Sequence, residues 1–292
     1  MTTWINGSTN IEESECLMNH VFKVEDCFSH EILTVARESY EANGYCVVDN
    51  VYPSTELDVM EAFFEDFKTQ GHKAFGDYIG TDDDLADNHV VDFDDIDPSK
   101  ELLRAMHPHR FSSQVKQWYL YPRIAQVLNF LFECPALAAQ TMYYYKPPQS
   151  VGQGMHQDNF FLLAKPATCI AAWTPLDDTD QENGCLKVVR GSHQEEILCP
   201  PSEGSILGMV GESEIIPICM QRGQTLFFSG QLIHGSEPNH SHTRSRRTFI
   251  AHYVDNMTEN LAKFYHPVLD MQGQVVNHVA VEQNGGPCQD VR

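Results

Sequence analysis

The sequence contains no run of about 18 apolar residues, and this absence predicts a chain that does not span a membrane. The first fifteen residues also lack the basic and then apolar pattern of a secretory signal peptide. None of the nine cysteines forms a Cys-x-x-Cys pair with another. An odd number of scattered cysteines is typical of reduced thiols, so we expect a cytoplasmic protein.

Basic residues are scarce, because 19 lysines and arginines stand against 41 aspartates and glutamates, for a net charge of −22. Such a charge opposes binding to nucleic acid and to anionic membrane surfaces. We interpret it either as a surface that maintains solubility or as a field that attracts a cationic small-molecule substrate. The sequence also lacks heptad repeats, and we expect a monomer or a homodimer.

Apolar residues are plentiful, and the 42% hydrophobic content with 16 phenylalanines excludes a disordered chain. The length of 292 residues fits one large domain. In the first half of the chain the apolar residues recur with helical spacing. Thr55 and Asp58 form a capping-box pattern, and Pro122 is expected to kink or split the helix around it. We predict helices over residues 29–43, 56–70 and 112–132, and a strand over residues 45–48.

An acidic stretch separates the second predicted helix from the third. Residues 77–97 carry nine aspartates and no lysine or arginine. A run of this kind is typical of a solvated loop. The alternative is a mobile lid that orders over the substrate, and such a lid would suit an amine-bearing substrate.

After Pro135 the sequence pattern changes to short apolar or alternating runs that are separated by glycine, proline and aspartate. Runs of this length with turn residues between them predict a β-sandwich or jelly roll. We therefore expect one domain in which an N-terminal arm and helical layer (1–134) packs on a double-stranded β-helix core (135–255), with the last residues (256–292) wrapped around the outside. The predicted strands cover residues 140–145, 168–175, 184–189, 225–229 and 248–254.

Three residues of the second half form a candidate metal site. On an extended segment residues i and i+2 share a face, so His156 and Asp158 can meet one ion, and His234 is the candidate third ligand. Two imidazoles and one carboxylate on one face of an octahedron suit non-haem Fe(II), because three positions remain open. On its own, however, a His-x-Asp triplet is a weak signal in a chain with 14 histidines. The other histidines that stand near glycine, proline or turns are predicted to lie in loops or to make structural hydrogen bonds: His107, His109, His193, His240 and His242.

The surroundings of the triplet strengthen the signal. Segments 154–193, 222–241 and 246–253 read GMHQDNFFLLAKPATCIAAWTPLDDTDQENGCLKVVRGSH, RGQTLFFSGQLIHGSEPNHS and RRTFIAHY, and a Lys-Pro-Pro lies upstream. In this order the motifs strongly resemble the phytanoyl-CoA dioxygenase family, over residues 141–253 and more loosely over the helices before them. The resemblance implies a jelly-roll oxygenase that uses Fe(II), with 2-oxoglutarate and O2 as co-substrates.

The resemblance also implies roles for single residues. His156, Asp158 and His234 match the catalytic iron ligands of the family. The family holds the distal carboxylate of 2-oxoglutarate with an arginine, whose planar fork matches a carboxylate. That arginine precedes the closing aromatic of its strand by seven residues, which selects Arg246 over Arg244 and Arg247. Gln157, Trp173, Ser236 and Met142 match further co-substrate contacts, although Trp173 and Met142 are equally well interpreted as core residues. A further basic contact is expected from Arg104 or Arg110.

The implied reaction is hydroxylation of an unactivated C–H bond with release of succinate and CO2. Asp158 favours oxygenation, because related halogenases replace this carboxylate with a small residue, but desaturation, ring formation and epimerisation stay open. The charge disfavours an acyl-CoA and favours a small, amine-bearing metabolite. Two alternatives are a cupin-like binding or regulatory protein without turnover and a zinc hydrolase that uses the same three ligands. The zinc hydrolase leaves the arginine unexplained, and a pure binder need not retain both the three ligands and an arginine.

Overall fold

The computed structural model describes residues 27–70, 97–100, 102–199, 206 and 215–282. Two antiparallel sheets form its centre. The larger sheet has the strand order β1-β8-β5-β10-β3-β12, and β2 also pairs with β3. Its strands are β1 (Tyr45–Val48), β2 (Arg104–Met106), β3 (Ala136–Tyr144), β5 (Ile170–Pro175), β8 (Thr225–Ser229), β10 (Thr248–Asp255) and β12 (Leu269–Asp270).

The smaller sheet has the order β4-β9-β6-β7 and, with the larger one, gives the jelly roll that the sequence predicts. All five strands predicted after Pro135 are present, with ends shifted by a few residues. Three short strands of this sheet were not predicted, because they span only three or four residues each. The strands are β4 (Gln153–His156), β6 (Leu186–Val189), β7 (Ile215–Ile218) and β9 (His234–Ser236).

Alternation along the strands of the larger sheet separates two buried layers. On β10, Phe249 and Ala251 pack into the core beneath the helices, whereas Ile250 packs into the core between the two sheets. On β5, Ala172 and Trp173 divide in the same way. Because successive side chains of a strand point to opposite faces, both faces of this sheet are buried. The inner layer is the one that faces the smaller sheet.

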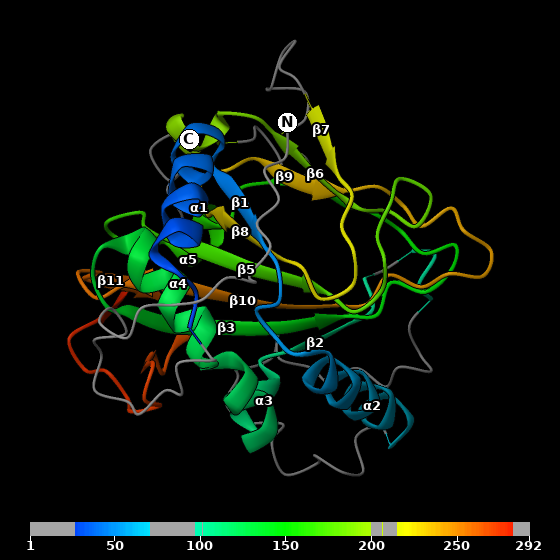
Figure 1. The fold of residues 1–292 in the computed structure, drawn as a ribbon, viewed down its shortest axis with the longest axis horizontal. Helices are drawn as coiled ribbons and strands as arrows, with labels where there is room; N and C mark the ends of the chain where they lie inside the picture. The colour runs from blue at the N-terminus through cyan, green and yellow to red at the C-terminus, as the bar shows by residue number, and fades with distance from the viewer. Residues whose placement is uncertain (1–26, 71–96, 101, 200–205, 207–214, 283–292) are drawn as a thin grey trace.

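Four helices cover the outer face of the larger sheet (Figure 1). Ser29 caps the first of them, and Gly44 ends it with φ +82°, a left-handed conformation that glycine adopts without strain. The second begins at Ser54, before Thr55, so the predicted capping box is wrong. Pro122 splits the third predicted helix in two, because proline fits the first turn of a helix and not its interior. The helices are α1 (His30–Asn43), α2 (Ser54–Gln70), α3 (Ser113–Tyr119) and α4 (Pro122–Phe132).

Phe64 of α2 is fully buried and contacts the larger sheet. Its ring stacks on Tyr143 of β3 with centroids 3.8 Å apart. We expect Phe64→Ala to lower the free energy of unfolding by about 3–5 kcal/mol, because a large buried ring leaves a cavity. Urea denaturation measures this loss. Val59→Ala, on the exposed side of the same helix, is the control and should change stability by less than about 0.5 kcal/mol. Equal effects of the two changes would contradict this account of the packing.

Part of the predicted C-terminal extension (256–292), as far as the structure describes it, contributes to the sheets and to a buried cluster. Strand β12 pairs with β3 and extends the larger sheet. Leu261, Val268 and Val279 form part of a separate buried cluster with the end of β3. Together with β1 and β2, which precede residue 135, these contacts support the proposal of one domain. The remaining elements are β11 (Asn260–Ala262), β13 (Ala280–Glu282), α5 (Asn159–Leu162) and the 3-10 helices η5 (Pro108–Arg110), η6 (Ser192–Gln194) and η8 (Lys263–Tyr265).

The structure contradicts part of the prediction about the cysteines. Cys27 and Cys199 are disulfide-bonded, so the prediction that all cysteines are reduced is wrong for these two. The described free thiols are those of Cys46, Cys134, Cys169, Cys185 and Cys219.

In the described part of the chain, no helix has both the length and the apolar character needed to cross a membrane. The acidic stretch lies in residues 71–96, outside the described ranges, apart from Asp97.

Candidate active site

A cavity of about 670 Å³ lies between the two sheets, and most of the residues predicted for the site line it. Its walls come from the inner face of β3, β5, β8 and β10, from the smaller sheet, and from β2 and η8. The predicted residues that line it are His156, Asp158, His234, Arg246, Trp173, Ser236, Met142 and Arg104.

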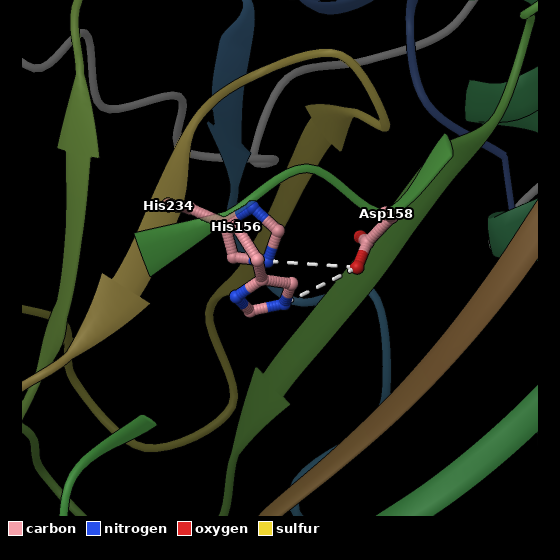
Figure 2. Close-up of side chains that lie close together, drawn as sticks. All are labelled: His156, Asp158 and His234. Carbon is pink, nitrogen blue, oxygen red and sulfur yellow. Dashed lines mark ion pairs between the residues drawn. The ribbon is translucent and has the colours of Figure 1, made fainter. Parts of the chain in front are cut away.

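The three predicted metal ligands converge within this cavity (Figure 2). One ligand atom from each lies within 4.8 Å of the other two. Oδ1 of Asp158 is 3.5 Å from Nε2 of His156 and 3.7 Å from Nε2 of His234. Both separations are below 4.2 Å, twice the metal–ligand bond length of about 2.1 Å, so one ion can bridge each pair. The positions fit a single cation.

The backbone reaches this arrangement differently from the extended segment that the sequence suggests. His156 is the last residue of β4 and pairs across the sheet with His234, the first residue of β9. Asp158 lies beyond the strand, with φ −63° and ψ −37°, immediately before α5. The chain therefore turns between the first two ligands, and the turn directs Asp158 across the cavity toward the two imidazoles (Figure 2).

Hydrogen bonds hold both imidazoles in the form that binds a metal. Nδ1 of His156 is 2.8 Å from the carbonyl of Gly154, and Nδ1 of His234 is 2.9 Å from the carbonyl of Leu232. A carbonyl can only accept, so each Nδ1 carries the proton and each Nε2 presents a lone pair. Three electron-rich atoms then face one another, which is the donor set that a cation requires.

Burial sets the charges in this cluster. It lowers the pKa of His234 to about 4, so this imidazole is neutral near pH 7. Burial alone would raise the pKa of Asp158, but the contacts with His234, His252 and His156 outweigh it and hold that pKa well below its usual value. The site therefore presents the carboxylate of Asp158 and the neutral imidazole of His234 to a cation.

Arg246 lies in the same cavity and is 4% exposed. Three of its five N–H hydrogens are donated: Nε to the carbonyl of Gly184 (3.2 Å), Nη1 to Oγ1 of Thr248 (3.1 Å) and Nη2 to Oγ of Ser236 (3.4 Å). Its guanidinium also lies 5.4 Å from the ring centroid of Trp173. Burial lowers its pKa to about 10, which still leaves it charged near pH 7. Two N–H hydrogens remain for a carboxylate.

The two neighbouring arginines lie elsewhere. Arg247 points to the opposite face, where its guanidinium pairs with Asp177 at 2.6 Å and with Glu61 of α2 at 2.7 Å. Arg244 pairs at the surface with Asp180 and Glu182. By contrast, no carboxylate of the described residues forms an ion pair with Arg246. A buried guanidinium without such a partner is costly unless a ligand supplies the anion.

The remaining predicted contacts divide into two groups. Met142, Trp173 and Ser236 line the cavity, whereas Gln157 does not. The Gln157 amide instead donates to the carbonyl of Gln231 (2.8 Å) and accepts from the N–H of Leu198 (2.8 Å), so it joins two loops. The residues predicted to lie outside the site do so: His107, His109, His193, His240 and His242, none of which lines the cavity.

Of the two basic candidates before the third predicted helix, Arg104 lines the cavity. Its Nη1 donates to the hydroxyl of Tyr144 at 3.2 Å. Arg110 is committed to the carbonyls of Phe264 and His266, at 2.7 and 3.0 Å, and does not line the cavity.

Sequence reasoning missed two buried residues of the cavity, Lys146 and His252. Nζ of Lys146 donates to Oγ of Ser236 (3.1 Å) and to the carbonyl of Glu237, and burial and then Arg246 lower its pKa to about 6. Lys146 belongs to the Lys-Pro-Pro motif, which was noted without a role. His252 of β10 shares a face of the strand with Ile250, and both line the cavity together with Arg246, which lies just before the strand.

Comparison with known proteins decides the family. The family model described as phytanoyl-CoA dioxygenase (PhyH) matches residues 40–248, which is most of the chain. The chain belongs to this family. The peroxisomal phytanoyl-CoA dioxygenase of Rattus norvegicus is 26% identical over 232 residues, covering 74% of this chain and 67% of that protein. A probable phytanoyl-CoA dioxygenase of Caenorhabditis elegans is 28% identical over 239 residues, covering 75% and 74%.

Solved structures with a similar fold agree with the two-sheet architecture. The epimerase SnoN, in complex with Fe3+, alpha ketoglutarate and nogalamycin RO, superposes with a TM-score of 0.62 at 16% identity, covering 88% of this chain and 95% of SnoN. EctD from S. alaskensis, with 2-oxoglutarate and 5-hydroxyectoine, gives 0.62 at 19% identity, covering 76% of each chain. The family membership confirms the predicted enzyme class, a 2-oxoglutarate-dependent dioxygenase of the non-haem iron type.

Proposed function

We propose that this phytanoyl-CoA dioxygenase family member hydroxylates an unactivated C–H bond of a small metabolite and releases succinate and CO2. The observation that carries the proposal is one cavity that holds both the His156, Asp158 and His234 cluster and the guanidinium of Arg246, which forms no ion pair within the described chain. Iron bound by the cluster would supply the oxidation by O2 that breaks the C–H bond.

The residues of the chain then have separate tasks. His156, Asp158 and His234 would hold Fe(II) and leave three of its six positions open. Arg246 would bind the distal carboxylate of 2-oxoglutarate with its two remaining N–H hydrogens, and Ser236 and Trp173 hold that guanidinium in place.

Two further residues complete the co-substrate site in this proposal. The hydroxyl of Ser236 lies within hydrogen-bond distance of Arg246, of Lys146 and of the N–H of Gln153, so it links the guanidinium to β4 beside the place of the carboxylate. Arg104 is the basic residue available for a further contact at the β2 side of the cavity.

The substrate side of the cavity is mainly apolar. Phe161, which lies three residues after Asp158, is 52% exposed, and Leu102 and Phe264 also line the cavity. An exposed aromatic side chain beside the ligand cluster favours a substrate that presents an apolar segment to the metal. Asp158 is the only carboxylate among the described lining residues. An amine-bearing substrate therefore depends on the acidic stretch, which lies outside the described ranges, and stays a prediction.

The rival functions make different use of the same cavity. A zinc hydrolase needs the three ligands and a water, but it leaves the buried charge of Arg246 without an anion. A binding protein without turnover would bind the co-substrate and release no succinate. Desaturation, cyclisation and the use of an acyl-CoA differ only in the substrate and in the fate of the product, so product analysis separates them from hydroxylation.

Anaerobic visible absorption tests the proposal. Metal-free protein should develop a charge-transfer band only after both Fe(II) and 2-oxoglutarate have been added, because the band requires the co-substrate to chelate the metal. Admission of air with candidate substrates should then release succinate, and mass spectrometry should find a product that is heavier by one oxygen atom. Absence of the band, together with absence of binding by calorimetry, would refute the proposal and leave the binding-protein alternative to be tested with other ligands.

Two broader predictions accompany the proposal. A monomer or homodimer is expected, which sedimentation of the purified chain measures. A cytoplasmic location is predicted from the scattered cysteines, but the disulfides of Cys27 and Cys199 are of a kind that persists in oxidising compartments. A fluorescent fusion in the source cell tests that location.

A further inference from the structure

His252 makes a contact with the ligand cluster that no role has yet explained. It lies on β10 and is 2% exposed. Its Nε2 is 3.1 Å from Oδ2 of Asp158, while Oδ1 of the same carboxylate faces His156 and His234. The two oxygens of Asp158 therefore have separate partners. One oxygen faces the metal position, and the other faces His252.

The direction of this hydrogen bond follows from its chemistry. A carboxylate that offers one oxygen to a cation can only accept at the other, so Nε2 of His252 is the donor in this hydrogen bond. Nδ1 of His252 has no hydrogen-bond partner in the described part of the chain. Among the described residues, the Asp158 contact is therefore the one hydrogen bond that orients this buried ring.

Strand β10 is regular at this position, because it pairs with β5 without a break from Thr248 to Tyr253. On its other side the register with β3 shifts between His252 and Tyr253, where Ala139 of β3 is the residue left without a partner. Arg246, just before β10, and Ile250 and His252 within it all line the cavity. One segment therefore brings the co-substrate arginine and the partner of Asp158 into a single cavity.

We infer that His252 is a positioning residue that holds Asp158 by Oδ2, so that the carboxylate offers the metal one oxygen and not two. The inference rests on the proposed function. A carboxylate rotates about its last torsion over a broad range, and a donor on one oxygen restricts that rotation. A second oxygen on the metal would occupy one of the three positions that the co-substrates need. Hydrogen-bonded partners of metal ligands elsewhere contribute about 10- to 100-fold in metal affinity or activity.

Two substitutions of nearly equal shape separate the donor from the space that it fills. His252→Gln retains an N–H donor at a similar distance along the side chain, and His252→Met replaces it with an apolar group of the same length. Co(II) binding to the metal-free protein is measured by calorimetry and by visible spectroscopy, without turnover. His252→Met should weaken binding by about 10- to 100-fold and alter the Co(II) spectrum, and His252→Gln should retain most of both.

The control removes another buried imidazole from the same region. His109 is 8% exposed, its Nδ1 lies 2.6 Å from Oγ1 of Thr141, and it does not line the cavity. His109→Met should lower the melting temperature and leave Co(II) affinity and spectrum unchanged. If His252→Met behaves like this control, His252 is an ordinary core residue and the inference is wrong. If both variants fold and bind Co(II) equally weakly, the metal affinity depends on the shape of the ring and not on its N–H donor. That result also overturns the inference.

A measurement on the wild type keeps the inference testable if the variants do not fold. In protein loaded with diamagnetic Zn(II), nitrogen chemical shifts of the histidine rings should show His252 protonated at Nε2. A deprotonated Nε2 would contradict the inference. Failure of the wild type to bind Fe(II) with 2-oxoglutarate would refute the proposed function, whereas normal binding with an unaffected His252→Met refutes only the role of His252.

Discussion

Asp158→Ala should reduce Fe(II) affinity by more than about 100-fold and bring succinate release to background. The expected loss exceeds the 10- to 100-fold effect that is typical of residues behind the ligands, because Asp158 faces the metal position itself. The substitution removes the single carboxylate of the cluster and leaves only the imidazoles of His156 and His234. Calorimetry with Fe(II) under anaerobic conditions measures the affinity, and the charge-transfer band with 2-oxoglutarate measures assembly of the site.

The control for this experiment is the substitution of a carboxylate outside the site. Glu259 is exposed and does not line the cavity, so Glu259→Ala should bind Fe(II) and release succinate like the wild type. The melting temperature of metal-free Asp158→Ala should fall by a few degrees, because the buried Nε2 of His252 loses its acceptor, and iron binding is therefore compared at a temperature where both proteins are folded. Normal iron binding by a folded Asp158→Ala variant would show that the metal lies elsewhere.

The residues of β10 and of the segment just before it show how much of the site the sequence pattern predicts. The spacing from Tyr253 selected Arg246, and the structure places Arg247 on the opposite face, where it pairs with Asp177. Ile250 and His252, two residues apart on one face of the strand, lie with Arg246 in the cavity. Alternation from Ile250 could have placed His252 in the cavity. A histidine on a buried strand, however, does not indicate a function until a carboxylate is found opposite it.

Other features depend on contacts between distant segments, and no local pattern contains them. Asp158 leaves the strand in a turn, and only the packing of α5 against the rest of the fold decides where its carboxylate points. Gln157 stands between two site residues, yet loops near positions 198 and 231 hold its amide outside the cavity. Phe264 enters the cavity from the C-terminal residues, whose sequence showed no periodicity to predict it.

Arg246→Gln should raise the KM for 2-oxoglutarate by about 30- to 1000-fold, with a smaller effect on Fe(II) affinity. Loss of one partner from a buried, hydrogen-bonded charge pair costs about 2–4 kcal/mol, and each 1.4 kcal/mol is a factor of ten. Arg246→Lys keeps the charge but loses the planar fork, so its KM should lie between those of the wild type and the glutamine variant. Succinate release at varied 2-oxoglutarate concentrations gives these values.

The neighbouring arginines supply matched controls, because three positions in one loop and strand differ in what they contact. Arg244→Gln removes only surface ion pairs with Asp180 and Glu182, and should leave both KM and melting temperature nearly unchanged. Arg247→Gln separates Asp177 from α2, so it should lower the melting temperature and leave the KM near that of the wild type. If the KM effect falls on Arg244 or Arg247 instead, the co-substrate carboxylate binds on another face of β10. Only a rise confined to Arg246 connects the buried guanidinium to 2-oxoglutarate, since all three variants lose the same charge.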